Sequence, residues 1–287
     1  MAGESISRRA VLAAGIAVGP AMVLGKRAFG EDLRGDELPL VTTGLEHIGM
    51  VVPDVEAATR FYSSVFNPDL QKEKDAPLRY YVMLGSGYIA IGSRAGVTVP
   101  KIDHYCTLVR GYNRELMTKA LAAKGISSAT RGVVPDPDGI GLQLIATPGG
   151  PGPTAVAGGR LVEVEPLVHA MGMDNIVLRV ADLRRSAEFY GQFFPKVLGR
   201  AGAVTEPGAR DQLAFKAADT LIILRASAPD ETPGVASYAV RVAKFDQAKV
   251  LRGLAALEAT VDRKSAAGAV RFRDPNGLAV ELKMSSG

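Results

Sequence analysis

The sequence has a single cysteine, no tryptophan and three histidines among 287 residues. With Cys106 alone, the chain cannot form an intramolecular disulfide or a metal site built from paired cysteines. It also has no glycine-rich phosphate loop between a strand and a helix, and no serine elbow. The few histidines are therefore informative, because a buried imidazole needs either hydrogen-bond partners or a metal.

An excess of one charge is also missing from most of the chain. Most of the formal net charge of +4 comes from residues 1–30, which hold four basic residues and one acidic residue, so that 30 basic and 29 acidic residues remain. No basic stripe is left to follow a phosphate backbone, and we expect no nucleic-acid partner. The length, with 47% hydrophobic residues, indicates two globular domains more readily than one.

Residues 1–30 have the layout of an export signal, with a charged start, an apolar run and small residues near the end. The apolar run of fifteen residues from Ala10 is short for a permanent membrane helix. Around Arg8 and Arg9 the segment resembles a twin-arginine signal, and an ordinary secretory signal or an uncleaved anchor is the alternative. The resemblance implies that the twin-arginine export machinery carries the folded protein to a periplasmic or other extracytoplasmic location. The mature form would then have no stable membrane span.

The chain contains two copies of one unit. The segment "HIGMVVPDVEAATRFYSSVF" from His47 aligns without a gap with "NIVLRVADLRRSAEFYGQFF" from Asn175. In each copy an apolar strand ends at an aspartate, Asp54 or Asp182, that is suited to cap the following amphipathic helix. The aromatic residues of both helices recur at helical spacing, and we interpret them as core.

The ends of the copies also match, with "DPDGIGLQL" from Asp136 and "DPNGLAVEL" from Asp274, and each predicts a tight turn followed by a strand. Within each copy a second strand and helix begin afresh, so that each copy consists of two halves. The first domain is predicted at 44–147 and the second at 171–285. The Pro- and Gly-rich segment between them, 148–170, is predicted to be a linker.

In the order of these motifs the sequence resembles the vicinal oxygen chelate superfamily, which includes glyoxalase I, type I extradiol dioxygenases and bleomycin-resistance proteins. The resemblance implies an α+β fold of tandem βαβββ units. They would form two domains with cupped mixed sheets and helices outside the cups. A ligand would lie in a cup.

The resemblance also implies a metal in the cup of the first domain, held by His47, His104 and Gln143. The fourth family position falls within Tyr88–Ile91, which offers no carboxylate. Two imidazoles and one oxygen ligand leave adjacent positions open, as in non-haem iron sites, so Fe(II) or Mn(II) is favoured. Gln143 departs from the glutamate expected of extradiol enzymes and removes one negative charge from the site.

The equivalent positions of the second copy hold Asn175, Ser237 and Glu281, so we interpret the second domain as a degenerate copy. His169 matches no ligand position. Cys106 should face the same way as His104, where it could be a soft ligand or simply a small buried hydrophobe.

The leading hypothesis is an exported metal-dependent enzyme, most like an extradiol dioxygenase, that acts on a small catechol-like molecule with two neighbouring oxygens. A metal-free small-molecule-binding protein, or a lyase or isomerase of the same superfamily, is the alternative. No acid–base residue is assigned, and association as a homodimer is left open.

Overall fold

The computed structural model describes residues 38, 40–127, 132–197, 212–262 and 265–285. The predicted export signal lies outside these residues. Among the helices of the described part, none is long and apolar enough to cross a membrane.

Four helices and fifteen strands make up the described part of the chain. The helices are α1 (Val55–Val65), α2 (Arg114–Ala122), α3 (Leu183–Tyr190) and α4 (Gln247–Ala256). The strands of the first sheet are β1 (Thr42–Val51), β2 (Leu70–Glu73), β3 (Arg79–Leu84), β4 (Gly87–Gly92), β5 (Lys101–Val109), β6 (Val133–Pro135), β7 (Gly141–Ala146) and β8 (Ala155–Gly159). The strands of the second sheet are β9 (Ala170–Val180), β10 (Gln212–Ala217), β11 (Thr220–Ala226), β12 (Gly234–Val242), β13 (Thr260–Asp262), β14 (Ala269–Arg273) and β15 (Ala279–Met284).

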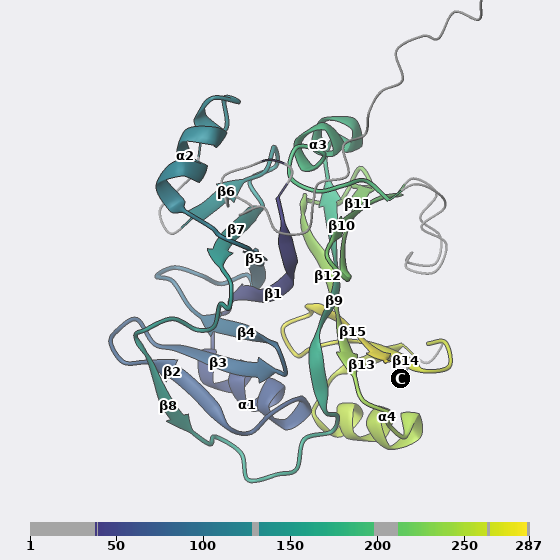
Figure 1. The fold of residues 1–287 in the computed structure, drawn as a ribbon. Coiled ribbons are helices and arrows are strands. Elements are labelled where there is room, and N and C mark those ends of the chain that lie inside the picture. The colour runs from purple at the N-terminus through teal and green to yellow at the C-terminus, as the bar shows by residue number, and fades with distance from the viewer. Residues whose placement is uncertain (1–37, 39, 128–131, 198–211, 263–264, 286–287) are drawn as a thin grey trace, which may run out of the picture. The chain divides into compact units, whose positions relative to one another are not determined.

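The first sheet has eight strands in the order β6-β7-β5-β1-β4-β3-β2-β8 (Figure 1). At its centre β1 pairs in parallel with β4 and antiparallel with β5, while β5 pairs in parallel with β7. The first strands of the two halves, β1 and β5, are therefore neighbours, and the strand that ends each half lies directly beside them. This arrangement places the predicted ligand positions on four adjacent strands.

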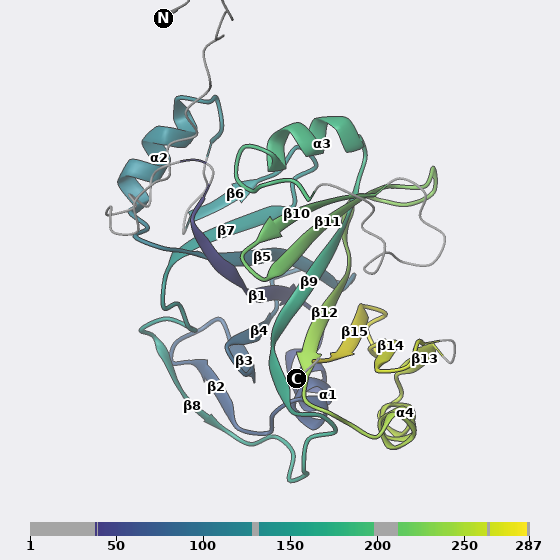
Figure 2. The same cartoon turned by 45° about the vertical axis from the view of Figure 1, so that its right-hand side comes forward.

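The second sheet has seven strands in the order β10-β11-β9-β12-β15-β14-β13, and Figure 2 shows β9 and β12 side by side. Its central strands β11, β9, β12 and β15 repeat the pairing of β4, β1, β5 and β7. The prediction of two tandem α+β units with mixed sheets is thereby confirmed. Within the described residues, only the first half of the first copy and the second half of the second copy show the full βαβββ order.

The two helices that open the copies begin as the sequence predicts. The carboxylate of Asp54 accepts a hydrogen bond from the Ala57 amide, and that of Asp182 accepts from the amides of Arg184 and Arg185. The aromatic residues of these helices are buried in the main hydrophobic core, which joins residues of both copies. The interpretation of these stripes as core is correct.

The repeated motifs meet across the two copies. Tyr62 of α1 donates to Asp274 Oδ2 at 2.8 Å, and Tyr190 of α3 donates to Asp136 Oδ2 at 3.0 Å. The first helix of each copy, which contains the Phe-Tyr pair, thus contacts the turn of the other copy that begins at Asp136 or Asp274. The other oxygen of each aspartate, Oδ1, accepts backbone amides of its own turn.

The segment predicted as a linker, residues 148–170, also contributes to the first sheet. Strand β8 lies within it and pairs antiparallel with β2 at the sheet edge. The amide of Gly150 donates to the carboxylate of Glu46 on β1. This Pro- and Gly-rich segment therefore forms a turn and an edge strand as well as a connection.

Candidate metal centre

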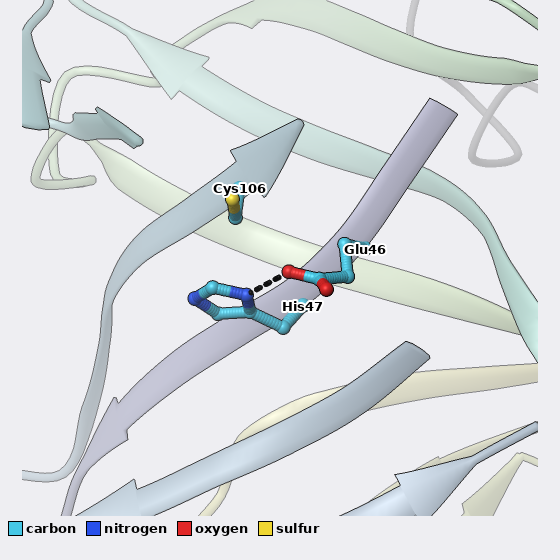
Figure 3. Close-up of side chains that lie close together, drawn as sticks. All are labelled: Glu46, His47 and Cys106. Atoms are coloured by element: carbon cyan, nitrogen blue, oxygen red, sulfur yellow. Dashed lines mark hydrogen bonds and ion pairs between the residues drawn. The ribbon is translucent and has the colours of Figure 1, made fainter. Parts of the chain in front are cut away.

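A β-bulge in β1 builds the candidate site. Leu45 pairs with Thr107 and Ile48 pairs with Tyr105, so that Glu46 and His47 together face the single residue Cys106 on β5. Regular alternation would place Glu46 and His47 on opposite faces of the sheet, whereas a bulge re-aims one of them. Both side chains are buried, at 2% and 4% exposure, and they form a cluster with Cys106 (Figure 3).

The imidazole of His47 is held on both of its nitrogens. Nδ1 lies 2.8 Å from Glu46 Oε2, and Nε2 lies 3.1 Å from Gln143 Oε1 on β7. The ring of Tyr88 on β4 stacks on the imidazole with centroids 4.4 Å apart and planes 18° apart. Side chains from β1, β4 and β7 therefore fix the orientation of His47.

His104 on β5 completes the predicted set. Its ring lies edge-on to that of His47, with centroids 5.4 Å apart. The side chain of His104 is 23% exposed and that of His47 is 5% exposed, so His104 lies on the solvent side of the pair. Gly49 provides the space for this ring, because a Cβ atom there would lie 2.0 Å from His104 Cε1.

The carboxylate of Glu46 is enclosed by the turn after β7. Its Oε1 accepts from the Gly150 amide at 2.5 Å. A Cβ atom at Gly149 would lie 2.1 Å from Oε1, and the φ of Gly149 is +79°, which favours glycine. The glycines of this turn therefore allow the backbone to approach the carboxylate closely.

The surroundings of His47 favour the neutral form of its imidazole. Burial lowers the pKa of His47 below its ordinary value, against the raising effect of Glu46. When a neutral ring donates from Nδ1 to Glu46, Nε2 carries a lone pair. With the side-chain amide of Gln143 oriented as it is, that lone pair faces Oε1, which is also an acceptor.

Two lone pairs that face each other, on His47 Nε2 and Gln143 Oε1, are suited to bind a cation as ligands. Ligand atoms about 2.1 Å from a metal and at right angles to each other lie about 3.0 Å apart. The 3.1 Å between Nε2 and Oε1 agrees with this spacing, and the second imidazole, His104, lies beside them. The spacing of His47 and Gln143 therefore fits a divalent metal, with His104 as the neighbouring imidazole.

Aromatic residues line the same face of the sheet beside His47. Tyr81, Tyr88 and Ala90 form a buried cluster separate from the main core, whereas Tyr80 is part of that core. Tyr88 donates to the Gly150 carbonyl at 3.3 Å. Burial raises the pKa of Tyr88, so its hydroxyl stays protonated and cannot act as a base at neutral pH.

The second copy has a different chemistry at the equivalent positions. Lys283 Nζ lies 2.9 Å from Asp174 Oδ1 and 3.8 Å from Glu281 Oε2, and Arg271 Nε donates to Glu281 Oε1 at 2.9 Å. Beside this network is a cavity of about 370 Å³ lined in part by Ser237. The acidic groups of the second copy are thus paired with the chain's own cations.

The structure brings together the three residues predicted from the sequence, His47, His104 and Gln143. Cys106 lies beside them as alternation predicts, with its side chain fully buried. His169 is exposed, and its carbonyl accepts the Ala243 amide. Sequence reasoning missed Glu46, and the only signal for it was its place directly before His47, which alternation directs away from the site.

Comparison with protein-family models matches residues 44–153 to the Glyoxalase/Bleomycin resistance protein/Dioxygenase superfamily. A search of curated proteins gave no significant match. The match spans the first copy, including His47, His104 and Gln143.

Many solved structures resemble the chain. LapB, a 2,3-dioxygenase from Pseudomonas sp. KL28, is 14% identical with a TM-score of 0.58, over 85% of this chain and 92% of that one. The Mn(II)-bound glyoxalase from Novosphingobium aromaticivorans is 15% identical with a TM-score of 0.58, over 86% and 83%. BphC, a halotolerant catechol dioxygenase, is 18% identical with a TM-score of 0.58, over 85% and 87%. At these identities the likeness concerns the fold.

Proposed function

We propose that this chain, whose residues 44–153 form a glyoxalase/bleomycin resistance/dioxygenase superfamily domain, is a metal-dependent enzyme most like the extradiol dioxygenases. The observation that carries the proposal is the convergence of His47, His104 and Gln143 on one face of the first sheet. The fold similarity to dioxygenases and to a Mn(II)-bound glyoxalase agrees with it.

The residues of the chain would have distinct roles around the metal. His47 Nε2, a ring nitrogen of His104 and Gln143 Oε1 would hold a divalent ion, with Fe(II) or Mn(II) favoured by two imidazoles and one oxygen. Such an ion supplies Lewis acidity and a template for two neighbouring substrate oxygens. Tyr88 keeps the His47 ring in place by stacking.

The cluster of Tyr81, Tyr88 and Ala90 supports an aromatic substrate. It is a buried apolar cluster on the same face as His47 and adjacent to it. A flat ring with two adjacent oxygens would bind at the edge of this cluster, with its oxygens toward the more exposed His104 side. A small catechol is therefore the substrate class that we propose.

The first test is the metal content of protein purified without air. We expect near-stoichiometric iron or manganese in the parent and none in the His47→Ala/His104→Ala variant. His169→Ala is the matched control, because this third histidine is exposed and should leave the metal content unchanged. Protein that holds no transition metal after reconstitution would contradict the proposal and favour a metal-free binding protein.

The second test separates the reactions. Catechols given to the metal-loaded parent should cause oxygen uptake with the appearance of a ring-cleaved product. Turnover without oxygen uptake would indicate a lyase or isomerase instead.

We further propose export of the protein, on the pattern of residues 1–30. In a bacterium with twin-arginine machinery, the parent should accumulate outside the cytoplasm and lose residues 1–30. An Arg8→Lys/Arg9→Lys variant should remain in the cytoplasm at full length. Equal distribution of both proteins would contradict this route.

A further inference from the structure

Glu46 has a position that the ligand set alone does not explain. It is 2% exposed, and its contacts are the imidazole of His47, the amide of Gly150 and the neighbouring thiol of Cys106. A buried carboxylate without a full counter-charge is unfavourable unless a cation or strong hydrogen bonds compensate it. The site thus places a carboxyl group one imidazole away from the predicted metal position.

The two oxygens of Glu46 are fixed by separate donors. Oε1 accepts from Gly150, and Oε2 is directed at His47 Nδ1 at 2.8 Å. Because a carboxylate only accepts, this contact requires the proton of His47 on Nδ1 and the lone pair on Nε2. Nε2 is the atom that lies beside Gln143.

His104 has a different environment. Its Nδ1 lies 3.4 Å from Asp103 Oδ2, but the same oxygen accepts from Arg94 at 2.7 Å, and Lys101 lies nearby. The charge of Asp103 is therefore balanced at the surface. Glu46 is the acidic neighbour whose contacts among the described residues are neutral.

We propose that Glu46 is a positioning residue that fixes the Nδ1–H tautomer of His47 and supplies, through the imidazole, the negative charge that Gln143 lacks. This inference rests on the proposed function, since it assigns a role toward a metal at His47, His104 and Gln143. Carboxylates that orient a metal-bound histidine typically change metal affinity by about 10- to 100-fold when they are lost.

The experiment has two readouts on four proteins: the parent, Glu46→Gln, Glu46→Gln/Gln143→Glu and Asp174→Asn. The first is the ring ¹⁵N spectrum of His47 in the metal-free protein, which reports the tautomer. The second is Mn(II) affinity, measured without air from the EPR signal of the free ion. Asp174→Asn is the matched control, because Asp174 takes the place of Glu46 in the second copy, where Asn175 aligns with His47.

We expect the parent to show the Nδ1–H tautomer and Glu46→Gln to show a mixture or the Nε2–H form. Mn(II) affinity should fall about 10- to 100-fold in Glu46→Gln. It should recover when Gln143→Glu returns the charge, and Asp174→Asn should bind like the parent. A Glu46→Gln protein with the parental tautomer and Mn(II) affinity within twofold of the parent would overturn the inference.

The outcomes distinguish this inference from the proposed function. If the parent fixes the tautomer through Glu46 but binds no Mn(II), the metal-dependent function fails, and with it the charge role of Glu46. If the parent binds Mn(II) and Glu46→Gln binds it equally, the function stands and the inference fails. If Glu46→Gln does not fold, the spectrum of the parent still tests the inference, and an Nε2–H tautomer of His47 in the parent would overturn it.

Discussion

The His104 ring occupies the space beside Gly49 that a larger side chain would need, and substitution of Gly49 by alanine tests this geometry. The added methyl group would lie 2.0 Å from His104 Cε1 and 2.5 Å from Nδ1. Ordinary contact begins at about 3.4 Å, so the ring or the strand has to move by about 1.4 Å. Gly49 does not have a left-handed φ, so alanine adds no backbone strain there.

The expected cost follows from the surroundings of the ring. Overpacking a close-packed site lowers the free energy of unfolding by about 1–3 kcal/mol. Because the His104 side chain is 23% exposed, the ring can turn toward solvent, and we expect the lower end, about 1 kcal/mol. Metal sites tolerate about 0.2 Å in ligand distance, so the displaced ring should no longer reach the ion. Gly49→Ala should then bind Mn(II) as weakly as His104→Ala.

Urea denaturation of four proteins checks this reasoning: the parent, Gly49→Ala, His104→Ala and the double variant. In the His104→Ala background the methyl group meets no ring, so Gly49→Ala should cost close to nothing. The second copy provides a natural comparison. There Val177 takes the place of Gly49 and Ser237 takes the place of His104, so a side chain is present where no histidine ring lies opposite. An equal cost of Gly49→Ala in both backgrounds, within about 0.5 kcal/mol, would refute the proposed clash.

Three further outcomes are expected. Tyr62→Phe removes the buried donor to Asp274 and should lower the free energy of unfolding by about 1–3 kcal/mol in urea denaturation. Tyr190→Phe tests the equivalent contact with Asp136. A loss below about 0.5 kcal/mol would contradict a stabilising role of the hydrogen bond. Burial raises the pKa of Asp274, so this group favours folding most below its ordinary pKa, and that contribution falls as pH rises through the raised value. Stability measured from pH 3 to 7 should therefore fall less with pH in Asp274→Asn than in the parent, and identical slopes would contradict the assignment. Cys106 is fully buried, and burial raises the pKa of its thiol, so iodoacetamide should modify it only after unfolding. Cys106→Ser should leave the metal content unchanged, whereas loss of metal in this variant would indicate that the thiol is a ligand.

Much of the fold could be predicted because the repeated unit contains sequence patterns that depend only on neighbouring residues. The capping aspartates Asp54 and Asp182 and the alternating strands depend on neighbours in sequence, so the order of elements follows from the pattern. The proximity of three candidate ligands was also predictable, since His47, His104 and Gln143 lie on strands that the topology makes adjacent.

The remaining features depend on contacts that no local pattern records. The bulge at Glu46 and His47 arises from the register of β1 against β5, and alternation predicts the opposite direction for Glu46. The bonds from Tyr62 to Asp274 and from Tyr190 to Asp136 join residues more than 50 positions apart. The motifs that identify each copy thus also hold the two copies together, which a comparison of the copies cannot reveal.

The contrast between the copies predicts the metal stoichiometry. In the first copy, neutral acceptors face each other at His47 and Gln143, and the carboxylate behind them has neutral contacts. In the second copy, Lys283 bridges the two carboxylates of Asp174 and Glu281, and an ammonium group there opposes the approach of another cation. Elemental analysis should therefore find one transition-metal ion per chain. Two ions per chain in the parent would show that an internal ion pair is no barrier to metal binding and would refute the electrostatic reasoning for the second copy.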